Sequence, residues 1–179
     1  DLPPGDRGRT SGSTSVAASF FMLGQPLPGR RLATLRQLLA LLRKREDVDA
    51  KKISLWGEST QPANDPKSVL VVPQGLSQPP HCEPVGPHLA LLAALYEDVA
   101  EVRARGGLVS WVSLFDSPAV HVPYDNIVPG AAKADWPAVV RAIKAPVRIE
   151  SPVDGLNRCA PLAEARKLYA GAKNATVND

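Results

Sequence analysis

The chain has 179 residues, of which 44% are hydrophobic and 22% are charged, and its formal net charge is +3 at pH 7. This composition is typical of one ordinary folded domain and excludes a disordered or fibrous protein. No patch combines basic with aromatic residues and no apolar run reaches about 18 residues, so we expect neither nucleic-acid binding nor a membrane-spanning helix. We therefore treat residues 1–179 as a single domain.

The first third of the chain contains one strong helical pattern. Residues 1–28 are rich in Gly, Pro, Ser and Thr and are predicted to form a long loop. A leucine stripe with the period of an α-helix predicts a helix over 29–46. A strand is predicted at 52–56, and the turn Gly57-Glu58-Ser59 follows it. The leucines of the stripe are Leu32, Leu35, Leu39 and Leu42, widened by Leu38 and Leu41.

The remaining two thirds alternate between helical and strand patterns. The apolar run at 108–115 suggests a strand that is buried on both faces. Such an alternation indicates an α/β fold with an open, mostly parallel, doubly wound sheet and flanking helices. The predicted elements, in chain order, are helix 88–105 closed by Gly106-Gly107, strand 108–115, helix 135–144, strand 146–150, helix 161–170 and strand 175–178.

Ser59 is the candidate nucleophile. The run Ile53 to Ser59 has the form of the strand-to-turn nucleophile elbow, in which a sharp turn after a strand projects a serine hydroxyl toward a base. Such a turn needs a small residue two positions before the serine, and Gly57 occupies that position. The backbone N–H of Thr60 is then expected to supply half of an oxyanion hole. The position two after the serine is normally small, and here it is Gln61.

Asp154 is the candidate triad acid because it directly follows the predicted strand 146–150. Catalytic groups gather at the carboxyl ends of parallel strands, and an aspartate there can orient a histidine. The alternative is an ordinary Asp-Gly turn. No histidine follows Asp154, although the triad order in this fold places it last. His81, His88 and His121 all precede it, and His121 is the one on the correct edge of the predicted sheet.

No cofactor, phosphate-binding loop or metal site is expected, because no Gly-rich loop and no metal-type spacing of His, Cys, Asp or Glu is found. Cys82 and Cys159 are the two cysteines, and their spacing does not establish a disulfide. The cellular location is left open.

Three stretches of the chain resemble an α/β-hydrolase of the acetyl xylan esterase and dienelactone hydrolase-like group. Asp6-Arg7-Gly8-Arg9-Thr10 is similar to the Asp-Arg-Gly loop of the family. The helix 29–46 with the run to Ser59 is similar to the helix and elbow that follow that loop. The third stretch, which runs over Asn126 to Gly130, Asp135 to Ile143 and Ala145 to Val147, is similar to the segment that leads into the strand of the triad acid, which places that acid at Asp154.

The resemblance implies a serine ester hydrolase that acts on an acetyl, short-chain acyl or carbohydrate ester and needs no cofactor. It also implies that the N-terminal strands of the fold and the segment with the catalytic histidine lie outside residues 1–179. An exposed sheet edge would then favour self-association. The alternative is a non-catalytic hydrolase-like domain with a binding or structural role. A ligand-binding flavodoxin-like domain is a third, for which no phosphate loop is found.

Overall fold

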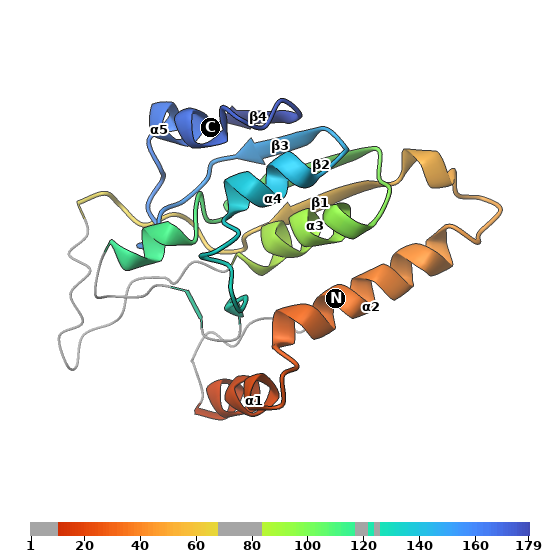
Figure 1. Ribbon diagram of the computed structural model, residues 1–179, viewed down its shortest axis with the longest axis horizontal. Coiled ribbons are helices and arrows are strands. Elements are labelled where there is room, and N and C mark those ends of the chain that lie inside the picture. Colours follow the sequence, from red (N-terminus) through yellow and green to blue (C-terminus); the bar gives the residue numbers. More distant parts are fainter. Residues whose placement is uncertain (1–10, 68–83, 117–121, 124–125) are drawn as a thin grey trace.

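The computed structural model describes residues 11–67, 84–116, 122–123 and 126–179 (Figure 1). The motif at Asp6 to Thr10 lies outside these residues, as do His81, Cys82 and His121. The described helices and strands, in chain order, are α1 (Ser11–Met22), α2 (Leu27–Leu42), the 3-10 turn η1 (Ala50–Lys52), β1 (Ser54–Glu58), α3 (Val85–Tyr96), β2 (Glu101–Arg105), the 3-10 turn η2 (Val112–Phe115), α4 (Trp136–Ala142), β3 (Val147–Glu150), α5 (Leu162–Tyr169) and β4 (Ala175–Asn178).

The four strands form one open parallel sheet in the order β1-β2-β3-β4, which is also their order in the chain. The predicted α/β class and parallel sheet are thus confirmed. A helix lies in each connection between neighbouring strands, as a parallel sheet requires. All four strands therefore point their carboxyl ends toward the same edge of the sheet.

One face of the sheet forms the hydrophobic core. Buried side chains alternate with exposed ones along each strand, which is the period of a strand with one covered face. Right-handed connections between strands that follow one another in order place α3, α4 and α5 on the same face, and Figure 1 shows α3 and α4 side by side there. The buried strand side chains are Leu55, Val102, Ala104, Val147, Ile149 and Val177.

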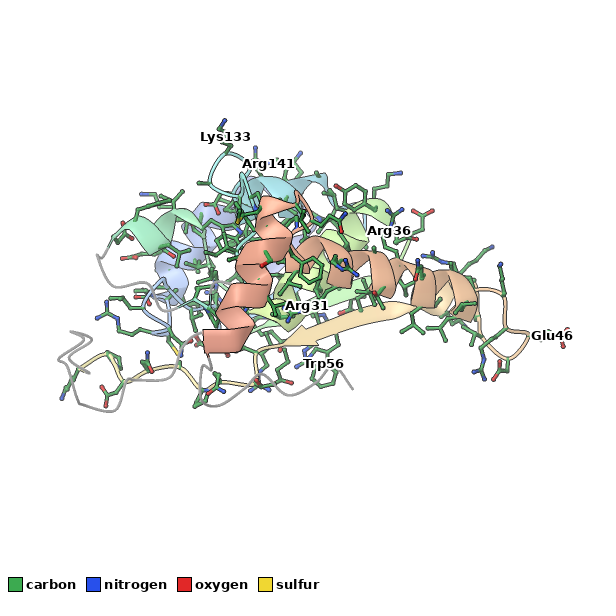
Figure 2. All side chains as sticks on the ribbon, turned by 90° about the horizontal axis from the view of Figure 1, so that it is seen from below. Arg31, Arg36, Glu46, Trp56, Lys133 and Arg141 are labelled. Carbon is green, nitrogen blue, oxygen red and sulfur yellow. The ribbon has the colours of Figure 1, made fainter. Side chains whose placement is uncertain are left out.

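The other face of the sheet is polar and uncovered in the described part of the chain. The strand register places Trp56, Arg103, Arg148 and Thr176 in one row across it. The Arg103 guanidinium lies 4.8 Å from the Trp56 ring centroid, and the Trp56 side of β1 is opposite to α2 in Figure 2. The cross-strand ion pairs on this face join Arg103 with Glu150 at 2.7 Å, Arg105 with Glu58 at 3.2 Å, and Arg148 with Glu101.

These charged rows show that no helix covers this face in the described part of the chain, and the doubly wound arrangement stays a prediction. A helix that packs on a parallel sheet buries its apolar stripe against apolar strand residues, whereas the outward positions of β2 are Glu101, Arg103 and Arg105. Among the described residues the fold therefore has two layers, one of helices and one of strands.

Two predicted elements in the middle of the chain are wrong. The helix predicted at 88–105 ends at Tyr96, and the chain becomes extended at Glu97 (φ −120°, ψ 138°) before β2 begins. The strand predicted at 108–115 is instead a loop followed by η2. Its side chains Leu108, Val109 and Trp111 are nevertheless buried in the core. The apolar run thus marks burial and not extended backbone.

The N-terminal part also differs from the prediction, because α1 occupies residues that were expected to form a loop. Helix α2 begins at Leu27 with Pro28 in its first turn, close to the predicted start. The helix packs on α3, with Leu39 in the core, and the carboxylate of Glu97 at the end of α3 accepts from Arg36 at 2.7 Å and from Arg43 at 2.5 Å. Leu38 and Leu41, the residues predicted to widen the buried stripe of α2, are exposed.

Candidate functional site

Ser59 directly follows β1 at the carboxyl edge of the sheet. Its N–H donates to the main-chain oxygen of Arg105 at 3.0 Å, which ties it to the end of β2. Its Oγ donates to the main-chain oxygen of Gln61 and accepts from the Gln61 N–H, both at 3.4 Å. The side chain is half-buried, and the next residue, Thr60, is exposed. The hydroxyl is thus placed at the predicted edge and held by its own turn.

Gly57 is needed for packing as well as for the turn. A Cβ added to Gly57 would lie 2.1 Å from the main-chain oxygen of Gly86, in the first turn of α3. A Cβ on Gly86 would in turn lie 2.5 Å from the main-chain oxygen of Glu58. The two glycines therefore let the start of α3 approach the end of β1 at main-chain distance, and any side chain here would force them apart.

The backbone after Ser59 differs from the elbow expected from sequence. A nucleophile elbow holds its serine on a strained turn. The non-glycine residues with positive φ in the described part of the chain are Ser151 and Asn157, so the backbone of Ser59 does not show this form of strain. No helix is formed between 60 and 67, and the next helix in the described part of the chain, α3, begins at Val85. Pro62 and Pro66 interrupt the chain here, so the strand half of the elbow is present without a helix directly behind it.

Asp154 lies in the loop after β3, at the same edge of the sheet as Ser59. Its Oδ1 accepts from the N–H groups of Leu156 and Arg158, both at 2.9 Å. Its Oδ2 accepts from the Arg158 guanidinium at 3.3 Å. The carboxylate thus organises its own loop, as in an Asx-type turn. Oδ2 is the less occupied of its two oxygens.

The loops that carry Ser59 and Asp154 are joined to each other by hydrogen bonds. The Asn64 N–H donates to the main-chain oxygen of Asn157 at 2.6 Å, and the Asn64 side chain donates to the oxygen of Leu156 at 2.8 Å. The Asn157 side chain donates back to the oxygen of Pro62 at 2.9 Å. Sequence reasoning missed both asparagines. The one available signal was an asparagine shortly after an Asp-Gly pair, because asparagine tolerates the left-handed backbone that such loops need.

His88 is the one histidine in the described part of the chain, and it is a core residue. It is 3% exposed in the first turn of α3, with its ring centroid 4.5 Å from that of Trp136 and 5.0 Å from that of Trp111. Neither ring nitrogen has a hydrogen-bond partner among the described residues. Burial lowers the pKa of His88 from 6.5 to about 3, because the surroundings of the ring, Trp111 and Trp136 among them, disfavour the charged form. This side chain is not placed to take a proton from Ser59.

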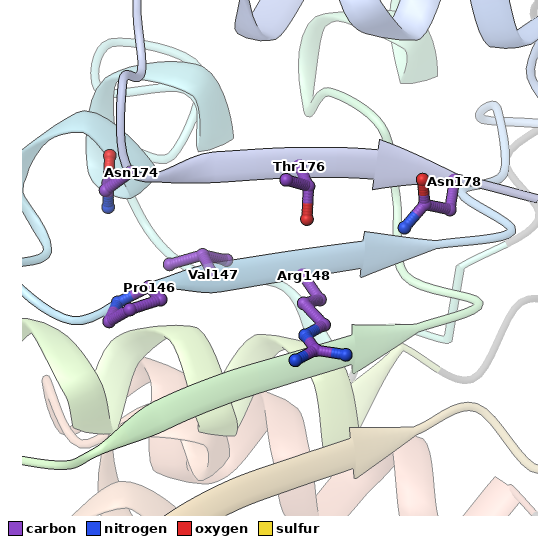
Figure 3. Close-up of a pocket in the computed structure, with 6 residues that line it drawn as sticks. All are labelled: Pro146, Val147, Arg148, Asn174, Thr176 and Asn178. Carbon is purple, nitrogen blue, oxygen red and sulfur yellow. The ribbon is translucent and has the colours of Figure 1, made fainter.

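One surface depression lies away from the predicted site. It lies on the polar face of the sheet, along β4 and the start of β3 (Figure 3). None of Ser59, Thr60 and Asp154 lines it. Its lining residues are Pro146, Val147, Arg148, Asn174, Thr176 and Asn178.

Within the described ranges, no three or more side chains of His, Cys, Asp and Glu gather closely enough to hold a metal ion. Cys159 is exposed with a free thiol. None of the described helices combines the length and the apolar character needed to cross a lipid bilayer.

In comparisons with known proteins, no family model, no curated protein and no solved structure matches the chain.

Proposed function

We propose that this chain is a serine ester hydrolase, or the catalytic side of one, with a partial α/β-hydrolase fold and a small-molecule or carbohydrate ester as substrate. One observation carries the proposal. Ser59 and Asp154 follow β1 and β3 at the same edge of a parallel sheet, serine first, and their loops are hydrogen-bonded to each other. The edge at which parallel strands end is where α/β proteins place their ligands and catalytic groups.

In this proposal Ser59 Oγ attacks the acyl carbonyl and the N–H of Thr60 donates to the oxyanion that forms. A histidine takes the serine proton and returns it to the leaving alcohol. His88 is excluded by its burial, so the histidine belongs to residues outside the described ranges. Asp154 would orient that histidine through Oδ2, whose bond to Arg158 is long at 3.3 Å. No cofactor takes part.

The test is turnover of a short-chain aryl ester by the full chain. We expect Ser59→Ala to remove the activity, because the covalent acyl intermediate needs the hydroxyl. Ser54→Ala is the matched control, since Ser54 is an exposed serine on the same strand and has no role in the proposal. Turnover that is unchanged in Ser59→Ala would rule out the assignment.

A non-catalytic binding or structural role is the second candidate, and the state of the two loops favours it. Both oxygens of Asp154 are engaged within its own loop, and the Ser59 hydroxyl is held by Gln61. An aspartate whose contacts are all local has the hydrogen bonds of a structural turn. This candidate predicts that the folded chain has no ester turnover above background and that Ser59→Ala leaves that background unchanged.

A further inference from the structure

Two asparagines, one in each of the two site loops, donate hydrogen bonds to the opposite loop. We call Pro62, Asn64, Leu156 and Asn157 the asparagine interlock. Each asparagine donates its side-chain amide to a main-chain oxygen of the opposite loop, and the Asn64 main chain adds a third bond. Asn64 and Arg158 also pair as an isolated parallel bridge. The interlock therefore behaves as a short additional piece of sheet beyond the ends of the strands.

Burial makes the interlock costly to break. Asn157 is 1% exposed and Asn64 is 7% exposed, so an amide that lost its partner here would be left without water. Such a group carries the full penalty of its desolvation. Asn157 also has a φ of +58°, a left-handed backbone that asparagine accepts more readily than most residues. Asparagine therefore suits this position both by its backbone conformation and by its amide.

The interlock connects two strands that the sheet does not pair. β2 lies between β1 and β3, so the ends of β1 and β3 are separated by roughly 10 Å, which is two strand spacings. The hydrogen-bond ladders of the sheet therefore do not connect β1 directly to β3. Ser59 is three residues before Pro62, and Asp154 is three residues before Asn157. The interlock thus makes the direct connection between the loop of the candidate nucleophile and the loop of the candidate acid.

The loop after β2 lies against the same point. A Cβ added to Gly155 would be 2.4 Å from the main-chain oxygen of Ser113, in η2. The three loops that follow β1, β2 and β3 therefore meet at main-chain distance, and Gly155 permits the contact. This arrangement leaves the loop of Asp154 little room to shift while the interlock is intact.

We propose that Asn157 is a positioning residue, which fixes the loop of Ser59 relative to the loop of Asp154. This inference rests on the proposed function for its catalytic meaning, while the mechanical link between the loops stands on the contacts alone. Asn157 touches neither the hydroxyl of Ser59 nor the carboxylate of Asp154 through a side-chain bond, so its effect is through the backbone that carries them.

The experiment compares Asn157→Asp and Asn157→Gly with the wild-type full chain. Asn157→Asp keeps the shape and removes the donor to Pro62. Asn157→Gly keeps the positive φ and removes the side chain. Asn174→Asp is the control, because the Asn174 amide also bonds three main-chain oxygens, those of Val140, Ile143 and Ala145, but far from the interlock along the chain.

The first readout is hydrogen exchange, which needs no catalysis. At a temperature where every variant is folded, we expect exchange across 59–64 to be at least about tenfold faster in both Asn157 variants and unchanged in Asn174→Asp. Equal exchange in wild type and Asn157→Asp would overturn the inference. The second readout is the rate at which a fluorophosphonate modifies Ser59, which we expect to fall by about tenfold or more in Asn157→Asp, since small misplacement of reacting groups is costly.

The two readouts separate the inference from the function on which it rests. Faster exchange together with slower modification of Ser59 supports both. Faster exchange in a protein whose Ser59 is never modified supports the link between the loops and rejects the serine hydrolase. Faster exchange with an unchanged rate of Ser59 modification rejects the positioning role, because the loop would then be loosened with no effect on the nucleophile.

Discussion

The α-carbon of Gly57 faces the main-chain oxygen of Gly86 so closely that a methyl group on Gly57 would lie 2.1 Å from that oxygen. The contact joins the end of β1 to the first turn of α3. Backbone atoms on both sides cannot move aside as a flexible side chain can. We therefore expect Gly57→Ala to lower the free energy of unfolding by about 3 kcal/mol, measured by urea denaturation.

Gly29→Ala is the control for this substitution. Gly29 is in α2, and a Cβ there would meet only Pro26 Cγ at 3.7 Å, an ordinary contact. Replacing glycine by alanine inside a helix is expected to raise stability by about 0.5–1 kcal/mol. If Gly57→Ala proves as stable as Gly29→Ala, the close approach of α3 to β1 is not present in solution.

The pH dependence of stability should report the buried His88. Its folded pKa is lowered to about 3, while an exposed histidine titrates near 6.5. Above pH 6.5 both states are neutral there, so His88 adds no dependence. Between pH 6.5 and pH 3 the unfolded state binds the proton more readily, and stability falls as pH falls. Over the range from 6.5 to 5 the loss should be about 2 kcal/mol.

His88→Leu isolates that effect, because leucine cannot bind a proton. The difference in urea midpoint between pH 7 and pH 5 should be smaller in this variant than in wild type. An identical pH dependence in the two proteins would show that His88 is hydrated in the folded state and that the Trp111 and Trp136 cage is open.

Much of the fold was predictable because helix and strand periods are local properties of the sequence. The patterns gave α2, β3, α5 and β4 within a few residues. β2 was missed because Val102 continues the apolar spacing of α3, so that helix and strand periods overlap. Its alternate positions are charged residues on the polar face of the sheet, which no helix covers in the described part of the chain. No local period of the sequence encodes whether a second layer covers that face.

The sequence predicted where the candidate site residues lie, but not the hydrogen bonds that connect their loops. Ser59 and Asp154 were found because each follows a strand pattern, and the structure places both at one edge of the sheet. The asparagine interlock was not found, since Asn64 and Asn157 are 93 positions apart and meet only through the order of strands. Nor does a sequence pattern reveal that the Asp154 carboxylate accepts hydrogen bonds from N–H groups of its own loop.

Tryptophan fluorescence offers a test of the uncovered sheet face. Trp56 is 63% exposed on that face, whereas Trp111 and Trp136 are 4% and 1% exposed. Iodide should therefore quench one tryptophan of three, and Trp56→Phe should lower the quenching constant several-fold. Trp136→Phe should leave the quenchable fraction in place. Weak quenching in the wild type would mean that this face is covered in solution.

Glu97 is expected to stabilise the packing of α2 on the rest of the molecule. Its carboxylate bonds both Arg36 and Arg43, and these two hydrogen bonds lower the pKa of Glu97. Glu97→Gln keeps the shape but loses the charge, and should cost about 1 kcal/mol because water screens part of the interaction. Asp47→Asn is the control, since the side chains of Asp47 and its partner Arg45 are both exposed, and its urea midpoint should not change. Equal midpoints for both variants would contradict a stabilising role for Glu97.

Mapping the site of a fluorophosphonate adduct on the full chain tests the central claim most directly. A serine activated at the carboxyl end of β1 should form one adduct per chain, located at Ser59 by peptide mass analysis. The adduct should persist in Ser54→Ala and disappear in Ser59→Ala. An adduct at any other serine, or a folded wild-type chain that remains unmodified, would contradict the assignment of Ser59 as the nucleophile.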